Sequence, residues 1–100
     1  MLKQTTAAPT AVLSTRRITS FDPQVALAFG AVIRSARVKQ QVAQDQFALI
    51  AGIDRSYYGK LERGERQPSL ALMLRIAGAL GVKGRDLMEQ TELALLREAV

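Results

Sequence analysis

The residues with the clearest capacity for chemistry lie between two glycines, Gly52 and Gly64. This segment holds Arg55, Lys60 and Arg63, whose charged groups donate hydrogen bonds to anions and to acceptor atoms on base edges. If the segment is a helix, these cations lie on the face turned away from the core. Such a helix could enter a DNA major groove and donate to guanine N7 and O6 or to phosphate. The alternative is an ordinary solvated face, since Arg and Lys are also good helix formers.

Other kinds of chemistry have few residues to support them. The 100 residues include no cysteine and no histidine, which removes thiolate chemistry, disulfides, the commonest general base and the commonest metal ligand. Catalysis would have to rest on Asp, Glu, Lys or Tyr, and the pattern indicates no paired carboxylates in a pocket. We therefore expect no catalytic residue, no metal and no cofactor.

The charge is unevenly distributed. The net charge is +5, and residues 34–66 hold seven basic residues against four acidic ones, whereas residues 67–100 hold four of each. A basic excess in one part of a small domain is what a polyanion-binding surface requires, although many soluble proteins are equally basic. No apolar run approaches the roughly 20 residues that span a bilayer, and the first twenty residues lack the apolar core of a secretory signal. We expect a cytoplasmic protein, associated with the nucleoid when bound to DNA.

The first helix is expected from Pro23 to about Lys39, after an N-cap at Asp22. Its apolar residues recur at helical spacing. Gly30 interrupts it at a cost of about 1 kcal/mol relative to alanine, which indicates close approach by a neighbouring helix.

Two short helices follow, joined by a tight turn. One begins near Val42 and ends at Gly52, and the next begins after Asp54 and ends near Gly64. Ile53 before the cap and Tyr58 after it can form a hydrophobic staple. Together the two helices predict a helix-turn-helix.

The remaining residues predict two more helices and no strands. Pro68 and Ser69 open a fourth helix that ends at Gly81, and a short fifth helix runs from Gly84 to about Thr91. The fold class is thus all-α with five helices. We divide the chain into a flexible basic tail (residues 1–21), a helix-turn-helix domain (22–92) and a C-terminal helical extension (93–100) that is a possible dimer contact.

Several motifs in register resemble one known family. They are Gly-x-x-Ile-Arg-x-x-Arg from Gly30, "AQDQFA" from Ala43, "ERG" from Glu62, and "PSL" with "IAGALGV" from Pro68 and Ile76. Over residues 27–88 the chain resembles the Cro/repressor (XRE-type) helix-turn-helix family, which implies the five-helix lambda-repressor-like fold. The resemblance also implies a dimeric, sequence-specific regulator of transcription that binds double-stranded DNA.

The resemblance implies roles for particular residues. Base contacts in the major groove would come from Arg55, Ser56, Gly59 and Lys60. Phosphate contacts, which set register and affinity rather than sequence preference, would come from Gln44, Tyr57, Arg63, Arg66, Gln67 and Ser69. Arg37 and Glu62 would form a structural ion pair between the first and third helices.

Two positions depart from the family pattern. Ala43 stands where a capping Ser or Thr is common, which loses about 1 kcal/mol and a possible phosphate contact. Gly59 stands where a side chain is usual, so direct reading there is absent or left to the backbone.

The two ends of the chain carry further candidates. An apolar stripe that a partner subunit would cover comprises Leu87, Met88, Leu93, Leu96 and Val100. Packing back on the first or fourth helix of the same chain is the equal alternative. Arg16 and Arg17 could form an arm in the minor groove, which attracts arginine, although a tail with no role is favoured.

The function expected from these features is sequence-specific DNA binding by a small regulator of transcription. Chains of this shape resemble restriction–modification controller proteins, phage or plasmid repressors, and antitoxins, and the sequence does not separate them. A different class is a protein-interaction module, such as an antitoxin whose helices bind a partner protein. DNA binding would weaken steeply with salt, whereas an apolar protein contact would not.

Overall fold

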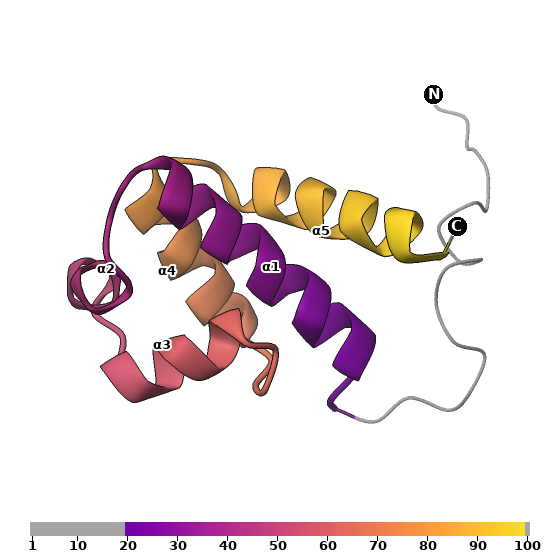
Figure 1. Cartoon of the computed structure of the whole chain (residues 1–100), viewed down its shortest axis with the longest axis horizontal. Helices are drawn as coiled ribbons and strands as arrows, with labels where there is room; N and C mark the ends of the chain where they lie inside the picture. Colours follow the sequence, from indigo (N-terminus) through magenta and orange to yellow (C-terminus); the bar gives the residue numbers. More distant parts are fainter. Residues whose placement is uncertain (1–19, 100) are drawn as a thin grey trace.

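The computed structural model describes residues 20–99, so the predictions made for Arg16, Arg17 and Val100 lie outside the described residues. The described part contains five α-helices and no strand (Figure 1), which confirms the all-α fold class. The helices are α1 (Pro23–Lys39), α2 (Gln44–Ala51), α3 (Arg55–Glu62), α4 (Leu70–Leu80) and α5 (Gly84–Ala99).

Side-chain caps begin three of these helices where the sequence predicts them. Asp22 accepts hydrogen bonds from the N–H groups of the first turn of α1, Asp54 does the same for α3, and Ser69 for α4. Each cap satisfies donors that the helix itself leaves unpaired. The helix-turn-helix arises because Gly52 ends α2 in the left-handed conformation (φ 71°) and Asp54 starts α3 two residues later. As predicted, Ala43 provides no side-chain cap to α2.

Helix α5 is longer than the sequence predicts. It was expected to end near Thr91, but it runs unbroken for 16 residues to Ala99, so the expected division between residues 92 and 93 falls inside a helix. Thr91 does not end the helix because its hydroxyl is buried and donates to the Leu87 carbonyl oxygen at 2.7 Å. Leu95, one turn further on, is also buried, so the second half of α5 packs on the same chain, alongside α1 (Figure 1).

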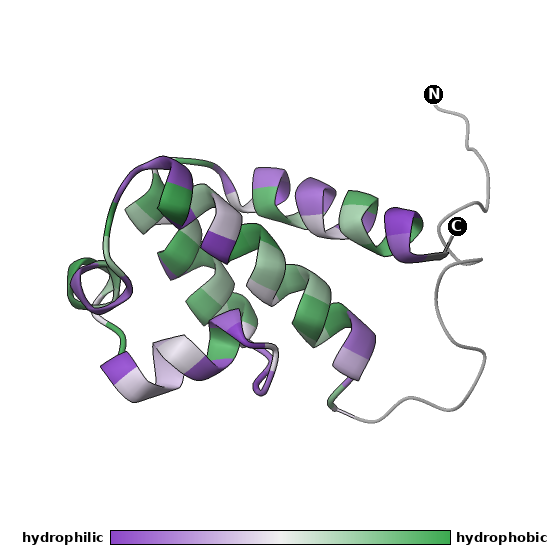
Figure 2. Ribbon diagram, viewed as in Figure 1, coloured by the Kyte–Doolittle hydropathy of each residue, from purple (hydrophilic) through white to green (hydrophobic). Residues whose placement is uncertain are grey.

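The hydrophobic core lies between the helices, whose apolar faces turn inward (Figure 2). Phe47 of α2 and Tyr58 of α3 lie at its centre, with ring centroids 5.2 Å apart. Ile53 in the turn belongs to the same cluster, as its role in a hydrophobic staple requires. Leu87 also belongs to it and is only 3% exposed. The prediction of a dimer contact at Leu87 is therefore wrong, because this side chain, in the first turn of α5, is buried in the core of its own chain.

Helices α1 and α3 approach each other closely at Gly30. A Cβ atom built on Gly30 would lie 2.5 Å from the carbonyl oxygens of both Leu61 and Glu62, at the end of α3. These oxygens are backbone atoms, so they cannot move aside without shifting α3. Gly30 thus lets α1 and α3 touch backbone to backbone, which confirms the close approach predicted from its position.

We expect Gly30→Ala to destabilise the fold although alanine is the better helix former. The clash with two backbone carbonyls should outweigh the propensity gain and leave a net loss of about 2 kcal/mol. Urea unfolding followed by circular dichroism measures the difference. The matched control is Gly78→Ala in α4, where a new Cβ meets nothing within 4 Å, and which should gain up to about 1 kcal/mol. Equal effects at both positions would contradict this account of the α1–α3 contact.

Candidate nucleic-acid interface

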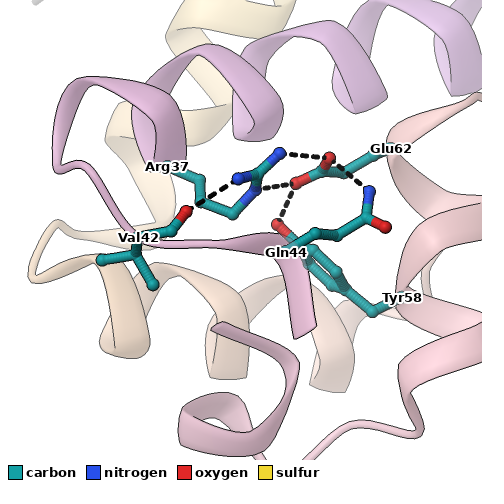
Figure 3. A network of polar contacts seen from close by, with 5 residues as sticks. All are labelled: Arg37, Val42, Gln44, Tyr58 and Glu62. Atoms are coloured by element: carbon teal, nitrogen blue, oxygen red, sulfur yellow. Dashed lines mark hydrogen bonds and ion pairs between the residues drawn. The ribbon is translucent and has the colours of Figure 1, made fainter. Parts of the chain in front are cut away.

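A buried carboxylate fixes the position of α3. Glu62 accepts hydrogen bonds from Arg37 Nε at 2.6 Å and Nη2 at 3.0 Å, so the predicted ion pair between α1 and α3 is present. The same carboxylate accepts the Tyr58 hydroxyl at 2.6 Å and Gln44 Nε2 at 2.8 Å. Each oxygen receives two donors (Figure 3), so the charge is fully hydrogen-bonded.

Arg37 extends this network to the turn before α2. Its Nη1 donates to the Val42 carbonyl oxygen at 2.7 Å. The network therefore joins four parts of the chain: α1, the α1–α2 turn, the start of α2, and α3 (Figure 3). The sequence-based reasoning missed the hydroxyl of Tyr58, which it assigned only to the core. The signal was available, because Tyr58 and Glu62 are four residues apart on one helix and so lie side by side.

The network controls protonation of its members. Burial alone would raise the pKa of Glu62, but the hydrogen bonds from Arg37, Tyr58 and Gln44 outweigh burial and hold the pKa below its ordinary value. Burial and the hydrogen bond to Glu62 both raise the pKa of the Tyr58 phenol, so it remains a donor. The hydrogen bond to Glu62 likewise raises the pKa of the Arg37 guanidinium.

The outer face of α3 carries the residues predicted to read bases. Arg55 and Ser56 are exposed in its first turn, and Lys60 is partly exposed one turn on. Arg55 Nη1 lies 3.3 Å from Asp45 Oδ2, but both side chains are well exposed, so the pair is weak and leaves the guanidinium available.

Gly59 differs from its neighbours on this face because it is buried. A Cβ atom built there would lie 3.1 Å from Arg63 Nη1 and 3.4 Å from Gln44 Oε1. The side chains of Gln44 and Arg63 therefore lie beside the bare backbone of Gly59. Burial leaves little of Gly59 itself free for the base contact that was predicted for it.

The predicted phosphate-contacting residues fall into two groups. Gln67 and Ser69 have structural partners: Gln67 Nε2 donates to the Ser20 carbonyl oxygen at 2.8 Å and its Oε1 accepts from the Asp22 N–H at 2.9 Å, while Ser69 caps α4. Local sequence signals could not reveal the Gln67 bridge, which joins residues 47 and 45 positions apart. The second group lies on or beside α2 and α3 and, like the first, is at least partly exposed: Gln44, Tyr57, Arg63 and Arg66. Gln44 and Arg63 also have side-chain partners, at Glu62 and Glu65.

Other kinds of site find no support in the described residues. Between residues 20 and 99, no cluster of three or more His, Cys, Asp or Glu side chains is arranged to hold a metal ion. Within the same range, no helix is both long and apolar enough to cross a membrane.

Comparison with known proteins agrees with this geometry. The helix-turn-helix (HTH_3) family model matches residues 33–87. The control protein C.BamHI of Bacillus amyloliquefaciens is 35% identical over 68 residues, which cover 67% of this chain and 84% of that protein. The chain belongs to the helix-turn-helix family of DNA-binding transcription regulators, as its motifs predict, and its relatives are regulators rather than enzymes.

Solved structures give the same result. The restriction-modification controller protein C.AhdI from Aeromonas hydrophila is 39% identical with a TM-score of 0.60, covering 62% of this chain and 94% of that one. The clp gene regulator ClgR from Corynebacterium glutamicum has a TM-score of 0.71 at 27% identity, covering 75% of this chain and 80% of that one.

We expect Glu62→Gln to destabilise the protein and to change how its stability depends on pH. The neutral amide leaves Arg37 buried without its counter-ion, which should cost about 3 kcal/mol at neutral pH. Because folding lowers the pKa of Glu62, its contribution is fully present above the ordinary carboxyl value of 4.5 and is lost as the pH falls through the folded-state pKa. The difference in unfolding free energy between wild type and variant should therefore shrink from pH 6 to pH 3.

The control for this experiment is Glu65→Gln. Glu65 Oε2 lies 2.7 Å from Arg63 Nε, nearly as short as the 2.6 Å contact between Glu62 and Arg37, but both side chains are about half exposed. Its unfolding midpoint should match that of the wild type, because exposed ion pairs contribute little. A difference between wild type and Glu62→Gln that stays constant over the whole pH range would contradict the role given to Glu62.

Proposed function

We propose that this chain binds a specific double-stranded DNA operator by placing α3 in the major groove. The observation that carries the proposal is the combination of an exposed, cationic α3 with a buried network that fixes its position. A rigid helix whose free donors point outward can make base contacts without first ordering its own backbone. Arg55, Ser56 and Lys60 are the residues we assign to base edges.

The flanking residues hold the phosphate backbone in this proposal. We assign Gln44, Tyr57, Arg63 and Arg66 to phosphates, since each is at least partly exposed on or beside α3 and none of them caps a helix or holds the start of α1. Gln67 and Ser69 support the surface indirectly, by holding the start of α1 and capping α4. The likeness to C.BamHI and C.AhdI supports a regulator of the controller type, acting in the cytoplasm on nucleoid DNA.

A two-fold dimer completes the proposal, because one such domain covers only half of a two-fold site. The surface we assign to the partner copy is an apolar groove between α4 and α5 lined by Leu70, Met73, Leu74 and Met88. Leu70, Leu74 and Met88 are 66%, 54% and 48% exposed and line the same groove, so they form one exposed apolar patch rather than scattered side chains. Leu93 and Leu96 are also exposed but do not line this groove.

Charge on the groove supports a second copy as its occupant. Among the charged residues that line the groove, the cations Lys83 and Arg85 come first along the chain, and the acids Glu89 and Glu92 follow. A two-fold axis that passes through the groove at right angles to α5 runs the two α5 helices antiparallel, which sets the cations of one copy against the acids of the other. Such a patch is self-complementary, as a two-fold interface requires.

The DNA proposal is tested by comparing Arg55→Ala with Arg66→Ala. Arg55→Ala should cost about 1–3 kcal/mol on the selected operator and relax preference at one base position. Arg66→Ala should weaken all sequences about equally and reduce the salt slope by about 1. Selection of bound sequences from a random DNA pool, followed by titration at several salt concentrations, measures both. Arg97→Ala on α5 removes the same charge away from both α3 and the groove between α4 and α5, and should change neither; identical behaviour of the first two variants would refute the orientation of α3.

The dimer is tested by Leu74→Glu. Sedimentation at tens of micromolar, without DNA, should show a dimer for the wild type and a monomer for the variant, because a carboxylate in the interface would be buried without a partner. Leu49→Glu is the control, since Leu49 on α2 is 81% exposed and lies outside the groove. A wild type that sediments as a monomer, or a dimer that survives Leu74→Glu, would rule out this interface.

A further inference from the structure

Arg63 is oriented more closely than an exposed arginine usually is. Its Nε donates to Glu65 Oε2 at 2.7 Å, and its Nη2 lies 3.5 Å from Glu65 Oε1. Glu65 thus occupies one edge of the planar guanidinium. The outer edge, formed by Nη1 and the second N–H of Nη2, makes no hydrogen bond to any residue between 20 and 99. Two parallel donors on that edge match the two oxygens of a phosphate.

The backbone of Gly59 leaves the space that the Arg63 guanidinium occupies. Nη1 would be 3.1 Å from a Cβ atom on Gly59, tighter than most real Cβ contacts, so any other residue there would push the end of the Arg63 side chain aside by a few tenths of an ångström. Gln44 Oε1 borders the same space, and hydrogen bonding of Gln44 Nε2 to Glu62 fixes the direction in which that oxygen points.

We propose that Gly59 is a positioning residue for DNA binding: by lacking a side chain it lets Arg63, oriented by Glu65, present its open edge to one DNA phosphate. This inference rests on the proposed function and adds a role for Gly59, which has no side chain to contact a base. Arg63 then binds the phosphate as a fixed two-donor fork rather than as a mobile charge. The fork carries no sequence information, and it fixes the depth and register of α3 in the groove.

The first test is Gly59→Ala, alone and combined with Arg63→Ala. Alanine favours the helix, and the atom it displaces is the end of a flexible side chain, so the melting midpoint should stay equal or rise. Affinity for operator and for random DNA should both fall about tenfold, with a salt slope smaller by about 1. In the Arg63→Ala background, Gly59→Ala should cost no further affinity. The matched control is Gly78→Ala, which should leave DNA binding unchanged.

The second test uses Glu65→Gln and separates orientation from charge. Removing an acid beside DNA should strengthen binding if only net charge matters. If Glu65 orients Arg63, binding should weaken instead, and the effect should vanish in the Arg63→Ala background. This variant also decides the matter if Gly59→Ala does not fold.

Either of two variants could overturn the inference. Gly59→Ala would do so by binding DNA as tightly as the wild type, or by losing as much affinity in the Arg63→Ala background as in the wild type. Glu65→Gln would do so by binding DNA more tightly than the wild type. In either case the proposed function stands if the wild type binds DNA with steep salt dependence and Arg55→Ala alters base preference. A wild type that binds no DNA would instead overturn the proposed function itself.

Discussion

The rest of the structure depends on one buried charge, the carboxylate of Glu62. An ionised group in a protein interior is tolerated only when its hydrogen bonds are complete, and here every partner comes from a different part of the fold or a different turn of α3. Helices α2 and α3 have eight residues each and are too short to persist alone. Satisfying Glu62 requires Arg37, Gln44 and Tyr58 to arrive together, so the angle of the helix-turn-helix is specified by chemistry as well as by apolar packing.

Much of this fold can be predicted from the sequence because the signals that start and end its helices are local. Asp22, Asp54 and Ser69 cap helices through atoms two or three residues away, and such signals survive without knowledge of the tertiary structure. What could not be predicted depends on partners far along the chain. Helix α5 continues beyond Thr91 because the Thr91 hydroxyl donates to the Leu87 carbonyl oxygen of the same helix and Leu95 is buried. Helix propensity alone reveals neither contact.

The candidate site shows the same division. The exposed cations of α3 follow from helical periodicity, and the ion pair to α1 follows from a family resemblance. The neighbours that the sequence did not reveal are those of residues whose contacts lie elsewhere in the fold: Leu87 in the core, Gln67 at the start of α1, and Gly59 beside Arg63. In each case the residue type is compatible with a role at the surface, and only the three-dimensional structure shows which residues it contacts.

The bridge made by Gln67 also fixes where the chain enters the domain. Because its amide holds the Ser20 carbonyl and the Asp22 N–H, residue 20 is tied to the loop that follows α3, rather than to the far side of the molecule. A fusion partner or fluorescent label joined directly ahead of Ser20 would therefore begin next to the proposed DNA surface. Attachment sites for reporters are better chosen at exposed polar positions of α5, such as Gln90. This residue is not part of α3 and does not line the groove between α4 and α5.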